Sequence, residues 1–104
     1  MVSIIMKNYW LYMLTNKNNK VLYIGMTGNL RERILKHKSG YASLFTTKYK
    51  CTKLVYYEKC LSKQLALNQE KRFKKWNREW KITLIEKSNP GWKDLFDTLD
   101  KVGT

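Results

Sequence analysis

Two runs of aromatic and β-branched residues near the start of the chain are separated by a polar turn. The runs are residues 9–15 and 21–25, and the Asn-rich residues 16–19 lie between them. Runs of this kind on either side of a turn are typical of paired β-strands. The pattern therefore predicts a β-hairpin.

The length of the turn sets the expected pairing of the two strands. If the loop is residues 16–19, Thr15 pairs with Lys20, and the same register puts Tyr12 opposite Tyr23. Opposed residues on antiparallel strands project from one face with their side chains in reach of each other. On the hairpin alone, an ordinary packing pair is the favoured interpretation of the two tyrosines.

A helix is predicted from Leu30 to about Ser39. Asn29 is a typical N-cap, and Glu32 stands where its carboxylate can accept from the cap's own amide. Gly40 is a typical residue for the helix end. Both ends of the helix are thus marked by local sequence.

Three basic residues lie on this predicted helix. Arg33 and His37 are four residues apart and share one face, and Lys36 lies beside them. Basic residues on a short helix are usually solvated, and that interpretation stays open for all three.

The next segment, residues 41–50, shows no periodic pattern, and we expect it to be irregular. Phe45 and Tyr49 are its expected apolar anchors. The residues between them are polar and include Thr46, Thr47 and Lys48.

Later segments predict a third strand and further helices. The strand covers residues 53–58, and a long helix capped by Ser62 runs to about residue 77. Residues 81–86 predict another helical turn or two, ended by the Asn-Pro pair at residues 89–90. The core stripe expected on the long helix is Leu65, Ala66, Phe73 and Trp76.

These elements together predict an α+β fold, in which helices flank a small three-stranded antiparallel sheet. The chain has 104 residues, which suits one domain and is too short for two. We expect a single domain over residues 1–104, with its core at about 8–97.

Glu70 lies at the edge of the apolar stripe on the long helix. A carboxylate half-buried beside apolar neighbours has to be paired, protonated or bound to a cation. In a chain with 8 acidic residues, Glu70 is the best single candidate for a metal ligand. An ion pair with a nearby basic residue is the alternative.

Charge adds a partner to this picture. The chain has 21 Lys and Arg against 8 Asp and Glu, a formal net charge of +13. This excess of positive charge indicates a polyanionic binding partner. Nucleic acid is the first candidate, because binding releases counterions from its phosphates. A basic protein that is merely soluble is the alternative.

An anionic membrane would also attract this charge, but residues 1–14 are too short and too interrupted for a span. They lack the features of a secretory signal, and we expect a cytoplasmic protein with no membrane association. Cys51, Cys60 and the single His37 exclude a four-ligand zinc site of cysteine and histidine. The two cysteines are expected to be packing residues.

The ordered set of motifs resembles the GIY-YIG nuclease superfamily over nearly the whole chain. Residues 23–25 match the family's Tyr-Ile-Gly motif, and residues 10–12 keep the tyrosine of the Gly-Ile-Tyr motif. The family's arginine and histidine on the next helix match Arg33 and His37. Its later glutamate and its asparagine near the end match Glu70 and Asn89.

More narrowly, the sequence resembles the small, single-domain, mostly bacterial branch of this superfamily. The shared features are Phe-Thr before a basic residue, a Tyr-Tyr-Glu strand end and a Glu-Lys-x-x-Lys-Lys-Trp helix, which here are residues 45–48, 56–58 and 70–76. The closing segment, residues 89–95, is also similar.

The resemblance implies an endonuclease that hydrolyses phosphodiester bonds with one Mg²⁺ or Mn²⁺ ion held by Glu70. It implies Tyr12 as the base that accepts a proton from water, favoured as phenolate by nearby cations. Tyr23 would bond the phosphate or the water, and Arg33 would hold phosphate oxygens. His37 would orient a tyrosine or contact the phosphate.

Further expected contacts surround this set. Gly25 would leave space for the nucleic-acid backbone, and Lys36 and Lys48 would contact it. Asn89 would be structural and tie a loop near the glutamate.

The expected substrate is DNA, in a repair or recombination setting, with RNA not excluded and with a protein partner for targeting as one option. Two alternatives stay open: a nucleic-acid-binding module without catalysis, and a nuclease subunit that is active only in a complex.

Overall fold

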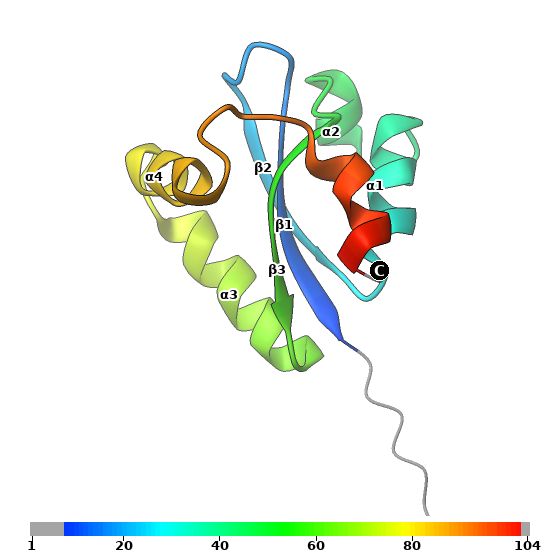
Figure 1. Cartoon of the computed structure of the whole chain (residues 1–104), viewed down its shortest axis with the longest axis vertical. Coiled ribbons are helices and arrows are strands. Elements are labelled where there is room, and N and C mark those ends of the chain that lie inside the picture. The colour runs from blue at the N-terminus through cyan, green and yellow to red at the C-terminus, as the bar shows by residue number, and fades with distance from the viewer. Residues whose placement is uncertain (1–7, 103–104) are drawn as a thin grey trace, which may run out of the picture.

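An antiparallel sheet of three strands lies between two layers of helices (Figure 1). The computed structural model describes residues 8–102, so the expectations about the first seven residues lie outside the described part. The strands are β1 (Tyr9–Thr15), β2 (Leu22–Thr27) and β3 (Lys53–Cys60), in the order β2-β1-β3. The predicted α+β architecture is confirmed.

Helices cover both faces of the sheet. One face carries α3 (Lys63–Lys75) and α4 (Arg78–Ser88), and the other carries α1 (Leu30–Lys38), α2 (Leu44–Lys48) and the 3₁₀ helix η1 (Leu95–Val102) (Figure 1). No helix among residues 8–102 is long and apolar enough to cross a membrane.

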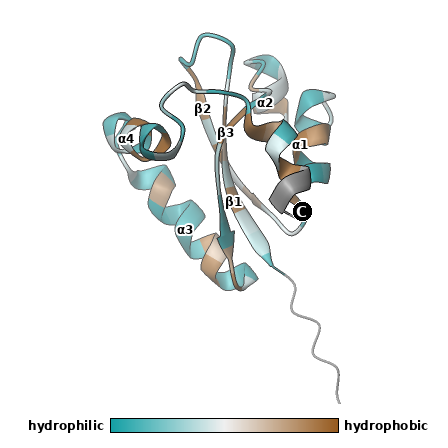
Figure 2. Cartoon of the chain, in the orientation of Figure 1, coloured by the Kyte–Doolittle hydropathy of each residue, from teal (hydrophilic) through white to brown (hydrophobic). Residues whose placement is uncertain are grey.

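The central strand β1 supplies side chains to both layers, because alternate residues of a strand point to opposite faces. Leu11 and Met13 pack in the cluster that contains Ala66 and Phe73 of α3. Tyr12 and Leu14 point the other way, into the cluster that contains residues of α1 and η1. Apolar (brown) and polar (teal) stretches alternate along the helices that flank the sheet (Figure 2).

The predicted hairpin register is wrong by two residues. Thr15 pairs with Leu22, and Tyr12 lies opposite Gly25 instead of Tyr23. The loop is longer because the Asn16 side chain accepts hydrogen bonds from the backbone amides of residues 20 and 21, at 2.9 and 3.2 Å. A shift of two residues keeps every side chain on its face, so both tyrosines still project to the same side.

The ends predicted for the first helix are confirmed. Asn29 caps α1 by accepting from the Glu32 amide at 3.2 Å, and Gly40 follows the helix with φ +81°. One detail differs, since Thr27 Oγ1 accepts from the Asn29 amide. The Glu32 carboxylate accepts instead from the side-chain amide of Asn29.

The prediction that residues 41–50 are irregular is wrong. They contain α2, which Ser43 caps by accepting from the Thr46 amide at 3.3 Å. The expected anchors Phe45 and Tyr49 are both about two-fifths exposed, whereas Thr46 is fully buried. A polar residue therefore anchors this short helix.

The predicted long helix is confirmed at its start, where Ser62 caps α3, but it ends earlier than expected. Trp76 leaves the helix, and Asn77 caps α4 by accepting from the Trp80 amide. The expected core stripe is correct for Ala66 and Phe73 and wrong for Leu65, which is 50% exposed.

Candidate active site

Four of the five residues expected to be catalytic meet on the face of the sheet covered by α1. Tyr12 of β1 and His37 of α1 are both buried, and Tyr12 Oη lies 2.8 Å from His37 Nε2. Arg33 Nε donates to Tyr12 Oη at 3.4 Å. The spacing of four residues between Arg33 and His37 lets one helix face supply both groups to a single phenol.

Tyr23 completes this group from the edge strand β2. Its ring centroid lies 6.4 Å from that of Tyr12 and 5.4 Å from the His37 ring. Tyr12 is fully buried, whereas Tyr23 is partly exposed and lines a cavity of about 280 Å³ with Phe45, Lys74 and Lys81. Tyr23 is therefore the tyrosine that reaches solvent.

The structural reason for a glycine at position 25 differs from the expected one. A Cβ at this position would lie 2.5 Å from Cζ of Tyr12 and would also clash with the Tyr12 hydroxyl. The space beside Gly25 is thus filled by the Tyr12 ring and is not open for a nucleic-acid backbone. The close approach follows from the actual register, which pairs the two residues.

Glu70 lies on α3, in the other layer of helices, and the structure gives it no direct bond to the tyrosines. Its side chain is 20% exposed, and Oε2 lies 3.6 Å from Nζ of Lys74, which is itself 56% exposed. An ion pair at that distance with one exposed partner contributes little free energy. The half-buried position expected for this carboxylate is confirmed.

Electrostatics connect Glu70 with the tyrosines and correct one expectation. Burial raises the pKa of Tyr12 to about 12, the hydrogen bond from Arg33 opposes this rise, and the negative charge of Glu70 adds to it. The phenol is therefore not held as phenolate by Arg33, because desolvation outweighs the cation. Glu70 is close enough to Tyr12 for its charge to act on the phenol.

His37 is buried in its neutral form. Burial first and the positive charge of Arg33 second lower its pKa to about 4. The interpretation of His37 as a solvated residue is wrong, since its side chain is 1% exposed. A neutral imidazole has one nitrogen that can accept a proton.

The donors available for a metal are few. Among the side chains that the structure describes, no three of His, Cys, Asp or Glu gather into a metal-binding group. Glu70 offers a partly covered carboxylate whose charge acts on Tyr12 and which is paired with Lys74 at 3.6 Å. A single hard oxygen ligand suits Mg²⁺ or Mn²⁺, which keep several waters or take phosphate oxygens.

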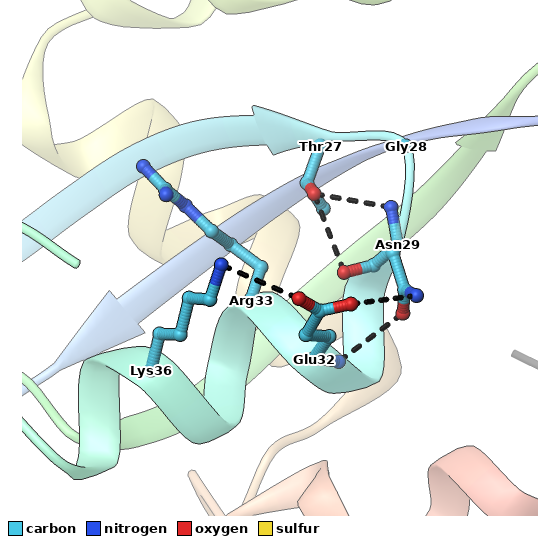
Figure 3. A pocket seen from close by; sticks show the side chains of 6 residues that line it. All are labelled: Thr27, Gly28, Asn29, Glu32, Arg33 and Lys36. Atoms are coloured by element: carbon cyan, nitrogen blue, oxygen red, sulfur yellow. Dashed lines mark hydrogen bonds and ion pairs between the residues drawn. The ribbon is translucent and has the colours of Figure 1, made fainter. Parts of the chain in front are cut away.

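The lysines expected to contact nucleic acid lie outside this group. Lys36 forms an exposed ion pair with Glu32 at 3.3 Å, at a hollow of about 250 Å³ that Arg33 also lines (Figure 3). Figure 3 shows Arg33 and Lys36 projecting from the same side of α1. Lys48 Nζ lies 5.4 Å from the centre of the Tyr49 ring and is also exposed.

Asn89 ties a loop, as expected for a structural residue. Its side-chain amide donates to the carbonyls of Val55 and Lys93, at 3.2 and 2.9 Å, and it accepts from the Lys93 amide. These bonds fix the chain after α4 against β3.

The sequence interpretation missed Thr46 as a member of the site. Its Oγ1 lies 2.9 Å from His37 Nδ1, and the residue is fully buried. The one available signal was its place in the Phe-Thr pair of residues 45–46, which indicated a shared motif but no contact.

The chain is similar to known proteins. A profile of the GIY-YIG catalytic domain matches residues 8–83. A UPF0213 protein of Bacillus pumilus is 35% identical over 79 residues, which cover 76% of this chain and 80% of that protein. A UPF0213 protein of Syntrophus aciditrophicus is 39% identical over 85 residues, or 81% of this chain and 94% of that protein.

A solved structure is also similar. The solution NMR structure of a UPF0213 protein from Bacillus halodurans superposes with a TM-score of 0.54 at 28% identity, covering 84% of this chain and 92% of that one. The fold is therefore of the nuclease type.

Proposed function

Because this chain belongs to the GIY-YIG family, we propose that it is a divalent-metal-dependent endonuclease that hydrolyses phosphodiester bonds in DNA, in repair or recombination. The observation that supports catalysis over mere binding is the buried contact of Arg33, Tyr12 and His37. Binding a polyanion needs exposed basic residues. It does not need a buried phenol between a guanidinium and an imidazole.

Tyr12 accepts the proton of the attacking water in this proposal. A phenol with a raised pKa is a poor base by itself, so its own proton moves to His37 Nε2, 2.8 Å away, as it takes one from water. The hydroxide then attacks phosphorus, and the leaving oxygen is protonated by solvent.

Arg33 links substrate binding to this proton transfer. Its guanidinium covers Tyr12 Oη in the free protein. Burial is the larger cause of the lowered pKa of His37, and the positive charge of Arg33 is the second cause. A phosphate that draws the guanidinium towards it uncovers the phenol and neutralises that charge. Both changes favour transfer of the proton to the imidazole.

Glu70 would hold one Mg²⁺ or Mn²⁺ ion. When bound, the ion supplies charge stabilisation for the phosphoryl and leaving oxygens. Lys74 releases the carboxylate readily, because their ion pair is long and Lys74 itself is exposed. Tyr23, the tyrosine in contact with solvent, bonds the phosphate or the water.

The experiment is cleavage of branched, nicked and linear DNA by purified protein with Mg²⁺ or Mn²⁺, repeated with a chelator. We expect the unchanged protein to cleave DNA and the chelator to abolish cleavage. The cleavage rate should fall at least about a hundredfold in Glu70→Gln and in Tyr12→Phe, while both variants still bind DNA. Glu79→Gln is the matched control, since Glu79 is exposed on α4, and it should cut like the unchanged protein.

Equal cleavage by the Glu70→Gln variant would exclude Glu70 as the metal ligand. Binding without cleavage of any substrate would favour the non-catalytic module. Cleavage that appears only after a partner protein is added would identify a subunit of a complex.

A further inference from the structure

Thr46 is a buried hydroxyl at the centre of a continuous hydrogen-bonded chain. Its amide donates to Ser43 Oγ at 3.3 Å, and its own Oγ1 donates to the Ser43 carbonyl at 3.3 Å. On the other side, Oγ1 lies 2.9 Å from His37 Nδ1. The cap of α2 thus fixes where the hydroxyl oxygen stands relative to the imidazole.

The direction of each bond in this chain follows from the available protons. When the Thr46 proton goes to the Ser43 carbonyl, which only accepts, Oγ1 is the acceptor for Nδ1–H of His37. A neutral imidazole then has a bare Nε2, which accepts from the Tyr12 hydroxyl. Arg33 Nε donates to the same phenolic oxygen.

The opposite tautomer leaves the buried Tyr12 hydroxyl proton without a partner. If Nε2 carried the proton, the Tyr12 oxygen would receive donors from both His37 and Arg33, and its own proton would have no acceptor among the bonds of residues 8–102. The Thr46 proton would turn to Nδ1, and the Ser43 carbonyl would keep the Thr47 amide and Thr47 Oγ1 as its donors. A buried donor without a partner destabilises the folded state, which disfavours this tautomer.

We propose that Thr46 is a positioning residue, which holds His37 in the Nδ1–H tautomer so that Nε2 is kept as the acceptor for the Tyr12 proton. The catalytic consequence rests on the proposed function, whereas the tautomer itself does not. The short helix α2 thereby becomes part of the proton path.

The tautomer can be measured directly in the intact protein. His37 is the single histidine of the chain, so its two ring nitrogens give unambiguous ¹⁵N resonances at neutral pH. We expect a protonated-type shift for Nδ1 and an unprotonated-type shift for Nε2. A protonated Nε2 in the unchanged protein would overturn the proposal without any variant.

Three variants separate positioning from packing. Thr46→Val keeps the shape and removes the hydroxyl, and it should give a mixture of tautomers. Thr46→Ser keeps the hydroxyl and should preserve the Nδ1–H form. Thr47→Val is the matched control, because Thr47 Oγ1 also donates to Ser43 O but lies exposed and does not touch His37.

Kinetics supply the second measurement. We expect Thr46→Val to lower kcat at least about tenfold with KM nearly unchanged, and Thr46→Ser to restore most of the rate. An unchanged tautomer and an unchanged kcat in Thr46→Val would overturn the proposal. If the unchanged protein cuts no DNA, the proposed function fails, and the ¹⁵N shifts still decide the role of Thr46.

Discussion

Gly25 has no room for a side chain because the Tyr12 ring lies against its backbone. Gly25→Ala should therefore push the ring from its site and lower the free energy of unfolding by about 1–3 kcal/mol, measured by urea denaturation. Gly91→Ala is the control, since a Cβ there meets only Lys93 side-chain atoms at 3.6 Å. Equal unfolding free energies for the two variants would show that the Tyr12 ring adapts freely.

The buried neutral His37 should make stability depend on pH. The pKa of His37 is about 4 in the folded protein, against the ordinary value of 6.5 expected in the unfolded chain. Between these two pH values the unfolded chain therefore binds more protons than the folded protein. The stabilisation is present above about pH 6.5 and is lost as the pH falls towards 4, by about 3 kcal/mol in all. Urea denaturation at a series of pH values measures it.

His37→Gln is the control for this prediction. It removes the titrating group, so the slope of unfolding free energy between pH 5 and about 6.5 should flatten. The same slope in both proteins would mean that His37 does not titrate differently on folding.

Among the elements, the hairpin depends on one side chain in its loop. Asn16 accepts from two backbone amides and thereby sets the loop length and the register. Asn16→Ala should lower the free energy of unfolding by about 1 kcal/mol, again by urea denaturation. Asn18→Ala, a change at an exposed residue of the same loop, should be nearly neutral.

The elements divide into those that local sequence predicts and those that it does not. Asn29 and Ser62 cap their helices from within the neighbouring four residues, so the starts of α1 and α3 were predictable. The helix α2 has no apolar stripe of its own. Its one buried member is Thr46, whose partner His37 lies nine residues earlier on another helix.

For the whole molecule, the charge of +13 predicts strong, salt-dependent binding to DNA. With a chelator present to prevent cleavage, Lys36→Ala and Lys48→Ala should each lower the slope of log K against log salt by about 0.7–0.9. Fluorescence anisotropy with labelled DNA at several salt concentrations measures that slope.

The control for this measurement lies on the opposite edge of the sheet. Lys59 is exposed on β3, whereas the tyrosine that reaches solvent is on β2 at the other edge. Lys59→Ala should leave the slope unchanged. An equal fall of the salt slope in all three variants would show that DNA binds without preference for the edge of the sheet that carries Tyr23.

The sequence by itself determined the α+β class, the face shared by Tyr12 and Tyr23, and the pairing of Arg33 with His37 on one helix face. These features depend on periodicity, and a period of two survives a register error of two residues. They also depend on spacing within one element, which the local backbone fixes.

Only the tertiary structure decided that Gly25 makes room for Tyr12, that burial raises the pKa of this phenol, and that Thr46 meets His37. Each of these depends on groups from different elements and on the water excluded between them. Desolvation and contact across elements are set by packing, which no local pattern of residues encodes.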